Sequence, residues 1–509
     1  MTVTMIVLAI VMYMAAMFYV GAKYSKQTSS SDEFYLGGRK LGPFVTAMSA
    51  EASDMSSWLL MGLPGVALLT GVTNGSGFAE AVWTAIGLAV GTYVNWLLVA
   101  RRIRIYSERT NSTTIPAFFS DRFGDKKGIL TAVSAIVIVI FFVPYTASGF
   151  AGIGKLFNSL FNVEYHIVMI IGAAIIIIYT VMGGFMAVST TDFIQSIVMT
   201  FALFVIICFG VENAGGLASI GESIKALPTV DSLGQYFSLT GTDGSYGFLP
   251  IVSTLAWGLG YFGMPHILLR FMAISDAKKL TLSRRIATVW VVISMGVAIF
   301  IGVVGFHFAS TSGILGMEGF DSERIVIYMA NAIAEMDSFA AIVAGLIIAG
   351  ILASIMSTAD SQLLAASSSV SENIVKRFFW KNMSNKAQMW LARLTVIVIA
   401  IVSVFLAWDS NSSVFRIVSF AWAGFGAAFG PVMLFALFWK RMNRNGALAG
   451  MIVGGAMVFI WKFLIAPMGG ILAIYELLPA FICACIAIIA ASLVTAPPSE
   501  EIVKEFESI

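Results

Sequence analysis

The sequence predicts an all-α polytopic membrane protein with thirteen transmembrane helices. Hydrophobic residues make up 59% of its 509 residues and charged residues only 11%, a composition that would not stay in solution without a bilayer. Apolar runs of about 20 residues, the length of a helix that crosses a bilayer, recur along the chain. Two of these runs are interrupted at their centres, one by polar residues and one by glycine and proline. The interruptions indicate a site inside the membrane.

Each expected span is an apolar run bounded by charged or turn residues. The runs lie near residues 4–22, 43–70, 77–100, 128–154, 164–184, 187–213, 247–272, 286–309, 336–370, 388–408, 414–438, 446–466 and 470–494. No Lys or Arg precedes the first run, which is too long for the apolar region of a signal peptide. We therefore expect it to be the first span.

Basic residues are distributed unevenly between the loops. Of the thirty Lys and Arg residues, 25 lie in the loops after odd-numbered spans or in the tail, four lie in the opposite loops, and Lys462 lies within a span. Because positive charge stays on the cytoplasmic side, we expect the N-terminus outside and the C-terminus inside. The tail, residues 495–509, is polar and acidic and is expected to be disordered.

The second expected span carries the most unusual polar residues. Its centre holds Glu51, Ser53, Asp54, Ser56 and Ser57. An ionisable side chain near the middle of a bilayer costs at least about 2.5 kcal/mol, so it usually marks an ion or substrate path. Gly62, Pro64 and Gly65 follow within two turns. The pattern predicts a broken helix whose freed carbonyl groups can bind a cation.

The seventh expected span is interrupted in a different way. Its centre contains Gly258, Gly260, Gly263 and Pro265, between Trp257 and His266. If the first span is set aside, the two interrupted spans lie five spans apart. Such a pair is typical of a transporter built from two inverted repeats, with its site near the membrane midplane. Glycine and proline also occur in membrane helices simply for close packing, and this interpretation stays open.

The ninth expected span places hydroxyl groups on one face. Ser354, Ser357, Thr358 and Ser361 recur three and four residues apart. Such hydroxyls often bond to carbonyls of their own helix. Beside a broken helix they can instead complete a site made of oxygen atoms, which suits Na⁺, whereas zinc or copper would require His or Cys. Neither the three His nor the three Cys residues have the spacing of metal ligands.

Several stretches are also specific enough to identify a family. They are residues 34–65, 141–149, 256–273, 351–364 and 419–451. On these stretches the chain resembles the solute:sodium symporter family over nearly its whole length. The resemblance implies a leucine-transporter-type fold with two inverted repeats of five helices, one preceding helix and two following helices. It also implies a bacterial cytoplasmic membrane and Na⁺ as the coupling ion.

The resemblance divides the chain into consecutive segments. These are the first span with its loop (1–41), the first repeat (42–213), an outer loop (214–246), the second repeat (247–438), two peripheral spans (439–494) and the tail (495–509).

No enzymatic activity is expected, because no Ser/His, metal or paired-aspartate arrangement is present. A channel would require repeated filter loops, which the chain lacks.

The resemblance also implies which residues form the site. The sodium residues would be Ala52, Asp54, Met55, Asp192, Ser354, Ser357 and Thr358. The substrate residues would be Ser56, Tyr145, Trp257 and Tyr261, with Gly258, Gly260, Gly263 and Pro265 shaping the second break. Arg39 and Lys40 match a basic pair at the inner end of the second span.

The expected activity is sodium-coupled import of L-proline. Helix N-termini at the breaks favour a carboxylate, and Trp257 and Tyr261, at i and i+4, offer aromatic area for a small ring. Glu51 and Met264 depart from the family pattern, because many proline transporters have a small residue and a Gln there. Another amino acid, pantothenate or proton coupling therefore remain alternatives.

Overall fold

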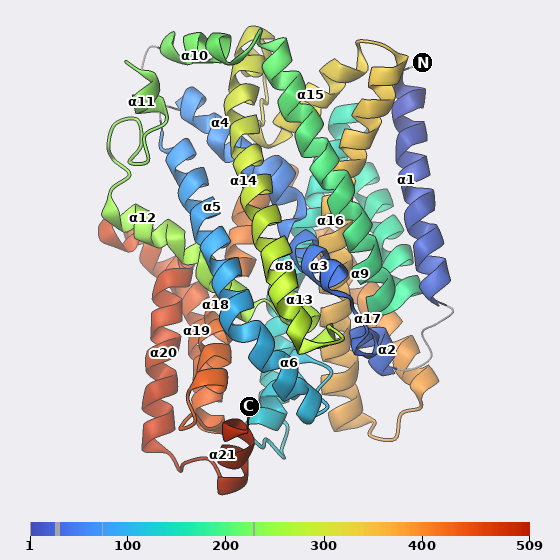
Figure 1. Cartoon of the computed structure of the whole chain (residues 1–509), viewed down its shortest axis with the longest axis vertical. Helices are drawn as coiled ribbons and strands as arrows, with labels where there is room; N and C mark the ends of the chain where they lie inside the picture. Colours follow the sequence, from blue (N-terminus) through green and yellow to red (C-terminus); the bar gives the residue numbers. More distant parts are fainter. Residues whose placement is uncertain (1, 26–30, 74, 228–229, 509) are drawn as a thin grey trace.

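The computed structural model describes residues 2–25, 31–73, 75–227 and 230–508 (Figure 1). Its α-helices are α1 (Thr2–Ser25), α2 (Ser31–Leu36), α3 (Pro43–Ser57), α4 (Leu63–Thr73), α5 (Gly77–Val94), α6 (Ala100–Arg109), α7 (Ile115–Arg122), α8 (Ile129–Phe161), α9 (Tyr165–Asn213), α10 (Leu217–Lys225), α11 (Leu233–Tyr236), α12 (Phe248–Leu255), α13 (Pro265–Ala273), α14 (Leu280–Thr311), α15 (Ile325–Ala334), α16 (Ser338–Val370), α17 (Asn385–Leu406), α18 (Val414–Phe438), α19 (Arg444–Ile460), α20 (Leu477–Val494) and α21 (Glu500–Glu507). In the described ranges the only isolated backbone bridge joins Leu41 and Ile274. The expected all-α architecture is confirmed.

Eleven helices in the described part of the chain are long and apolar enough to cross a membrane. One of them, α9, contains two of the expected spans. Gly184 interrupts it with φ +63°, a conformation that glycine adopts at no steric cost. Tyr179 and Thr191 share a hydrogen bond across this point, although twelve residues of straight helix would separate them by about 18 Å. The two halves of α9 therefore fold back on each other.

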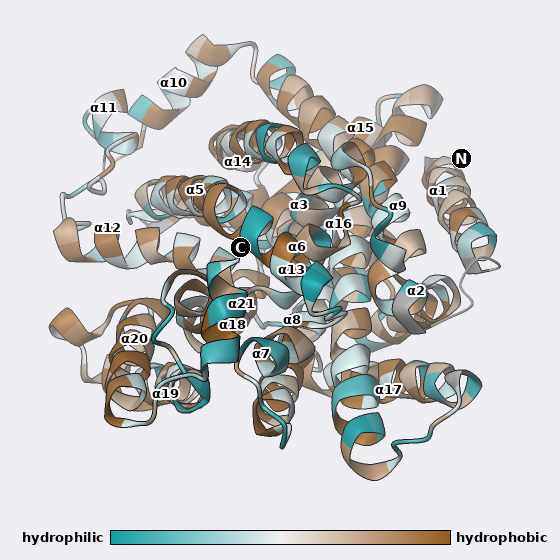
Figure 2. Ribbon diagram, turned by 60° about the horizontal axis from the view of Figure 1, so that its bottom comes forward, coloured by the Kyte–Doolittle hydropathy of each residue, from teal (hydrophilic) through white to brown (hydrophobic). Residues whose placement is uncertain are grey.

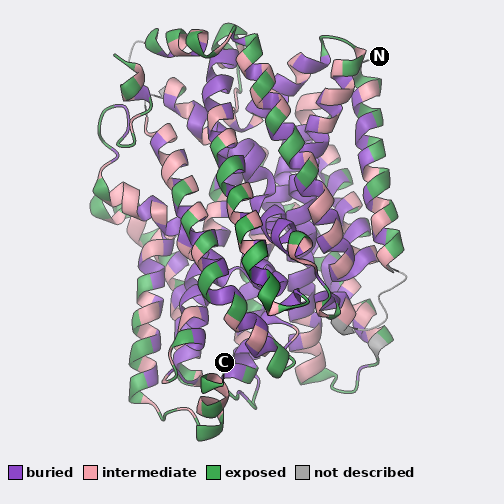
Figure 3. Ribbon diagram, in the orientation of Figure 1, coloured by how far each residue is buried: buried purple, intermediate pink, exposed green. Residues whose placement is uncertain are grey.

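The most buried helices lie at the centre of the bundle. α3, α16 and α18 are largely buried, whereas α1, α17 and α19 expose most of their length. Figure 3 shows the buried residues gathered in the interior. Hydrophobic residues also cover much of the outer helices, such as α19 and α20 (Figure 2), as a bilayer requires.

The expected break in the second span lies at Ser56. This residue has φ +35° and ψ −166°, so it leaves the helical conformation at the end of α3. A π segment, Trp58–Gly62, then leads into α4. The break falls inside the polar patch, about two turns before the Pro64 and Gly65 positions that were expected to contribute to it.

The expected break in the seventh span is a 3₁₀ segment, Ala256–Gly263, between α12 and α13. Met264 is extended, and Pro265 occupies the first turn of α13. A Cβ atom on Gly258 would lie 2.3 Å from the carbonyl oxygen of Gly87 in α5, and one on Gly263 would lie 2.2 Å from that of Phe425 in α18. These glycines allow the unwound backbone to touch its neighbours.

The tail is a docked helix, and the expectation of disorder was wrong. Ile502 and Phe506 lie one turn apart on α21 and form its apolar face. A Cβ atom on Gly124 would lie 2.8 Å from Ile502, and the guanidinium of Arg122 lies 4.8 Å from the centre of the Phe506 ring. Lys440 forms an ion pair with Glu507 at 2.9 Å. Figure 1 places α21 at the opposite end of the bundle from the start of α1.

The close approach at Gly263 yields a first prediction. Replacing Gly263 with Ala should destabilise the protein by about 1–3 kcal/mol, because the added methyl group would meet backbone atoms that cannot rotate away. Gly296→Ala is the control, since a Cβ atom there meets nothing within 4 Å. The measurement is the thermal midpoint of the purified protein in detergent. Equal midpoints for the two variants would contradict the packing argument.

Candidate ion and substrate site

One backbone carbonyl and one backbone N–H group freed by the first break meet hydroxyl groups of α16. The Ser357 hydroxyl donates to the carbonyl oxygen of Ala52 at 2.8 Å and lies 3.2 Å from that of Ser354. The Thr358 hydroxyl donates to Ser354 O at 3.1 Å and accepts from the backbone N–H of Ser56, also at 3.1 Å. The break in α3 is thus held by hydroxyls of one other helix.

This oxygen cluster joins four residues expected at the sodium site: Ala52, Ser354, Ser357 and Thr358. Met55, the fifth, contributes a carbonyl that accepts a hydrogen bond from the N–H of Trp58. The expected ligand atoms are carbonyl and hydroxyl oxygens without formal charge, and the residues that carry them are buried. Because a hydroxyl can rotate its hydrogen away, Ser357 and Thr358 can turn lone pairs towards a cation in place of their present bonds.

Asp54 lies at the centre of the predicted substrate residues. Its Oδ2 atom accepts a hydrogen bond from the Tyr261 hydroxyl at 2.7 Å, and its carbonyl oxygen accepts from Tyr145 at 3.1 Å and from the Trp58 indole at 3.2 Å. Its Oδ1 atom is buried without a hydrogen-bond partner among the described residues. Asp54 therefore joins the first break, in α3, to the second break through Tyr261.

Glu51, the acid that departs from the family pattern, lies one turn before Asp54. It is buried, and its carboxylate accepts hydrogen bonds from the Trp96 indole at 2.9 Å and from Thr92 at 3.4 Å. Both donors come from the third expected span. The sequence could not indicate these partners, since their positions depend on how α5 packs against α3.

Trp257 and Tyr261 do not share one face, as an α-helical i, i+4 spacing would require. They lie in the 3₁₀ segment, which has about three residues per turn. The Trp257 ring packs against Phe415 and Tyr475, with ring centres 5.3 and 5.2 Å apart. The Tyr261 ring lies 5.0 Å from that of Trp422, which also lies 6.3 Å from the Trp257 ring. The structure brings Ser56, Tyr145 and Tyr261 together around Asp54 and places Trp257 above them.

Asp192, on α9, belongs to a second polar cluster, which includes Ser49, about one turn nearer the start of α3 than Ala52. Its Oδ2 atom accepts hydrogen bonds from Ser49 at 2.6 Å and from Arg270 at 3.0 Å. Arg270 also donates to Ser361 at 2.6 Å, and Ser361 donates to Asp360 at 3.3 Å. All five residues are buried. One guanidinium thus stands among two carboxylates and two hydroxyls from α3, α9 and α16.

Arg270 was counted from the sequence as a loop charge, and this was wrong. It lies inside α13 and donates to the carbonyl oxygen of His266 at 2.9 Å. Its position within an apolar run, five residues after Pro265, could have indicated a buried cation. Asp360 was likewise given no role, although an acid in the middle of a span is itself a signal of function.

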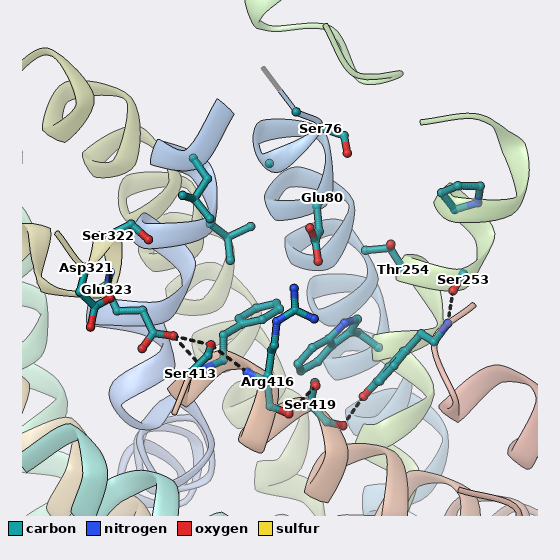
Figure 4. A pocket seen from close by; sticks show the side chains of 18 of the residues that line it. Ser76, Glu80, Ser253, Thr254, Asp321, Ser322, Glu323, Ser413, Arg416 and Ser419 are labelled. Carbon is teal, nitrogen blue, oxygen red and sulfur yellow. Dashed lines mark hydrogen bonds between the residues drawn. The ribbon is translucent and has the colours of Figure 1, made fainter. Parts of the chain in front are cut away.

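A cavity of about 1100 Å³ lies on the other side of the aromatic residues. Trp257, Phe415 and Tyr475 line it, and the Trp257 ring lies 6.3 Å from that of Trp58, next to the first break. Figure 4 shows polar and charged side chains from several helices pointing into this space. The aromatic residues thus form a floor between the cavity and the cluster around Asp54.

Glu323 is another residue that the sequence did not indicate. Its carboxylate accepts hydrogen bonds from Ser413 at 2.8 Å, Val414 N at 3.1 Å and Phe415 N at 3.2 Å, at the start of α18. Lys155 forms an ion pair with it at 2.8 Å. A carboxylate satisfies the free N–H groups of a helix N-terminus and suits its positive dipole end. Glu323 therefore fixes the start of α18 at the cavity wall.

Comparison with known proteins places these features in context. The model of the sodium:solute symporter family matches residues 34–454. The sodium/proline symporter of Haemophilus influenzae is 43% identical over 502 residues, covering 97% of this chain and 95% of the relative. A high-affinity proline transporter of Bacillus subtilis is 42% identical, covering 96% and 98%. A solved outward-open, substrate-bound Na⁺-coupled sialic acid symporter has the same fold, with a TM-score of 0.77 and 21% identity over 97% of this chain and 99% of that one.

The second polar cluster yields a prediction about stability. Replacing Arg270 with Met should lower the free energy of unfolding by about 3–5 kcal/mol, because the buried Asp192 carboxylate loses its ion pair with the guanidinium. Arg285→Met, an exposed position on α14, is the matched control. Thermal denaturation in detergent measures both. A midpoint for Arg270→Met equal to that of the control would show that the guanidinium does not hold the cluster together.

Proposed function

This chain belongs to the sodium:solute symporter family, and on that premise we propose that it imports L-proline together with Na⁺ by alternating access. The observation that carries the proposal is that the carbonyl of Ala52 and the N–H of Ser56, both freed at the first break, bond to hydroxyls of α16. The carbonyl and hydroxyl oxygens of such a site carry no formal charge themselves and suit a hard monovalent cation. The protein does no covalent chemistry in this proposal; Na⁺ is its coupling ion.

The sodium ion would bind to the carbonyl oxygens of Ala52, Met55 and Ser354 and to the hydroxyls of Ser357 and Thr358. Support comes from the hydrogen bonds that already hold four of these residues together. Asp54 would contribute negative charge beside this site, since its Oδ1 atom has no partner among the described residues. Asp192, held by Arg270, would act on the ion from one turn away.

Proline would bind around Asp54, in contact with Ser56, Tyr145 and Tyr261, with Trp257 covering it on the cavity side. Relatives named as proline transporters, at 43% and 42% identity, support this choice of substrate. Met264 in place of the usual amide leaves open another amino acid or pantothenate. Proton coupling is the less favoured alternative, because a proton does not need the hydroxyls of Ser357 and Thr358.

Sodium entry would supply the energy for uptake. Each charge that crosses 100 mV yields about 2.3 kcal/mol. Sodium bound at the first break would order Ser56 and Asp54, which then meet the substrate. Each ligand would therefore raise the affinity for the other by the same factor.

The proposed topology has thirteen crossings, in a bacterial cytoplasmic membrane, with the N-terminus outside and the C-terminus inside. The reversal of α9 at Gly184 and the broken segment 248–273 supply the two crossings beyond the eleven long helices. The inverted repeats would span residues 42–213 and 247–438, with 1–41 and 439–494 peripheral. The segment 214–246 would be an outer loop and 495–509 a cytoplasmic tail.

The ion site is tested by changing both hydroxyl residues of α16. Ser357→Ala with Thr358→Ala should raise the Na⁺ concentration for half-maximal thermal stabilisation at least tenfold, about 1.4 kcal/mol. Ser367→Ala, whose hydroxyl bonds only within α16, is the control. An unchanged Na⁺ requirement in the double variant would remove the sodium site from this helix.

The substrate is tested by thermal stabilisation of the purified protein with proline. Millimolar proline should raise the midpoint in Na⁺ and not in K⁺, because the proposed Na⁺ site orders the residues that meet the substrate. Tyr261→Phe should weaken the proline effect by about 1 kcal/mol, the usual contribution of one hydrogen bond. If pantothenate or another amino acid gives the Na⁺-dependent shift and proline does not, the substrate assignment fails.

The topology is tested with single cysteines in a variant that lacks Cys208, Cys483 and Cys485. Cysteine at the exposed position Ser245 should react with an impermeant thiol reagent added to intact cells, and cysteine at the exposed position Lys126 should react only after permeabilisation. The reverse pattern would invert the proposed orientation.

A further inference from the structure

Two opposite charges point into the large cavity without an ion pair. Glu80 lies in the first turn of α5 and Arg416 in the first turn of α18. Figure 4 shows the Arg416 side chain directed from the aromatic floor towards Glu80. No ion pair or side-chain hydrogen bond of either group occurs with the described residues, although the Arg416 charge acts electrostatically on the Glu80 carboxylate.

The other charged residues of this cavity already have partners. Their ion pairs are Lys155 with Asp321 and Glu323, Arg324 with Asp321, and Lys462 with Glu476. Glu80 and Arg416 are therefore the two charged side chains lining the cavity that are left unpaired within the described part of the chain. They come from opposite halves of the bundle, one from each proposed repeat.

The location of Arg416 makes an anionic partner favourable. A cation in the first turn of a helix lies at the positive end of the helix dipole, where its charge is destabilised. Glu323 already satisfies the backbone N–H groups at this N-terminus, so its carboxylate is committed to them. A second carboxylate that approached Arg416 would relieve the unfavourable charge.

We propose that Glu80 and Arg416 form an ion pair that closes the outer cavity over bound substrate. The inference rests on the proposed transport function. In the structure the cavity is open and the pair is unmade. Movement of the start of α5 towards the start of α18 would bring the two side chains together above Trp257. Because the contact exists only in the closed state, it stabilises that state relative to the open one.

Thiol accessibility below the pair provides the test. A single cysteine at Ser419, which lies below the Arg416 side chain in Figure 4, reports on access to the cavity floor. In the variant that lacks Cys208, Cys483 and Cys485 and is otherwise unchanged, Na⁺ and substrate should slow the reaction of this cysteine with an impermeant reagent. Glu80→Gln and Arg416→Gln should each reduce this protection about fivefold, the change that an ion pair of about 1 kcal/mol produces.

The controls remove the same charges elsewhere in the cavity. Glu476→Gln and Lys462→Gln alter the net charge of the same cavity by the same amounts, but they break a pair that is already formed in the open state. In both control variants, Na⁺ and substrate should still slow the reaction of the cysteine at position 419. If these controls lose as much protection of the cysteine at position 419, the effect comes from cavity charge in general, and the proposed ion pair between Glu80 and Arg416 is contradicted.

Exchange of the two charges gives a second, independent test. Glu80→Arg combined with Arg416→Glu should recover most of the protection that each reversal alone removes. The exchanged variant must first have the same thermal midpoint as the wild type. If it then recovers no protection, the proposed ion pair is contradicted. If the wild-type background shows no protection with Na⁺ and any tested solute, the proposed transport function fails instead, so the two failures are distinguishable.

Discussion

The structure depends on one constraint: a helix broken inside a membrane must satisfy its freed backbone groups without water. At the first break the N–H of Ser56 finds the Thr358 hydroxyl, and the carbonyl of Ala52 finds the Ser357 hydroxyl. The carbonyl of Asp54 accepts two side-chain donors, Tyr145 among them. The polar face of α16 is therefore not a separate feature of the sequence. It is the partner that lets α3 break where it does.

The same contacts explain how ion and substrate binding can be linked. A cation among these oxygens would replace hydroxyl-to-carbonyl hydrogen bonds, so its binding would alter the groups that now hold Ser56 and Asp54. Tyr261 carries that change to the second break through its hydrogen bond with the Asp54 carboxylate. Both breaks and the hydroxyl face thus form one polar network, closed on the cavity side by an aromatic floor.

Local patterns in the sequence were sufficient for much of this account. The two breaks and the hydroxyl face each leave a signal within about 30 residues, and the structure contains all three. Long-range partners leave no such signal. The contact of Arg270 with Asp192 joins residues 78 positions apart, and the Glu323 clamp on α18 joins residues 90 positions apart. The i, i+4 spacing of Trp257 and Tyr261 did not indicate that they lie in a 3₁₀ segment.

The docked tail shows that amino-acid composition alone does not predict whether a segment packs against the rest of the protein. Its acidic residues indicated disorder, yet Ile502 packs where Gly124 leaves room and Glu507 pairs with Lys440, so that α21 is docked. Only the packed bundle provides that surface, so the tail sequence alone could not predict it.

The most direct test of the central claim is uptake of labelled L-proline into proteoliposomes under an imposed ion gradient. The account predicts accumulation with an inward Na⁺ gradient, and only equilibration when Na⁺ is equal on both sides or when a proton gradient replaces it. Accumulation driven by the proton gradient in the absence of Na⁺, or no accumulation of proline with Na⁺ while another solute accumulates, would contradict it.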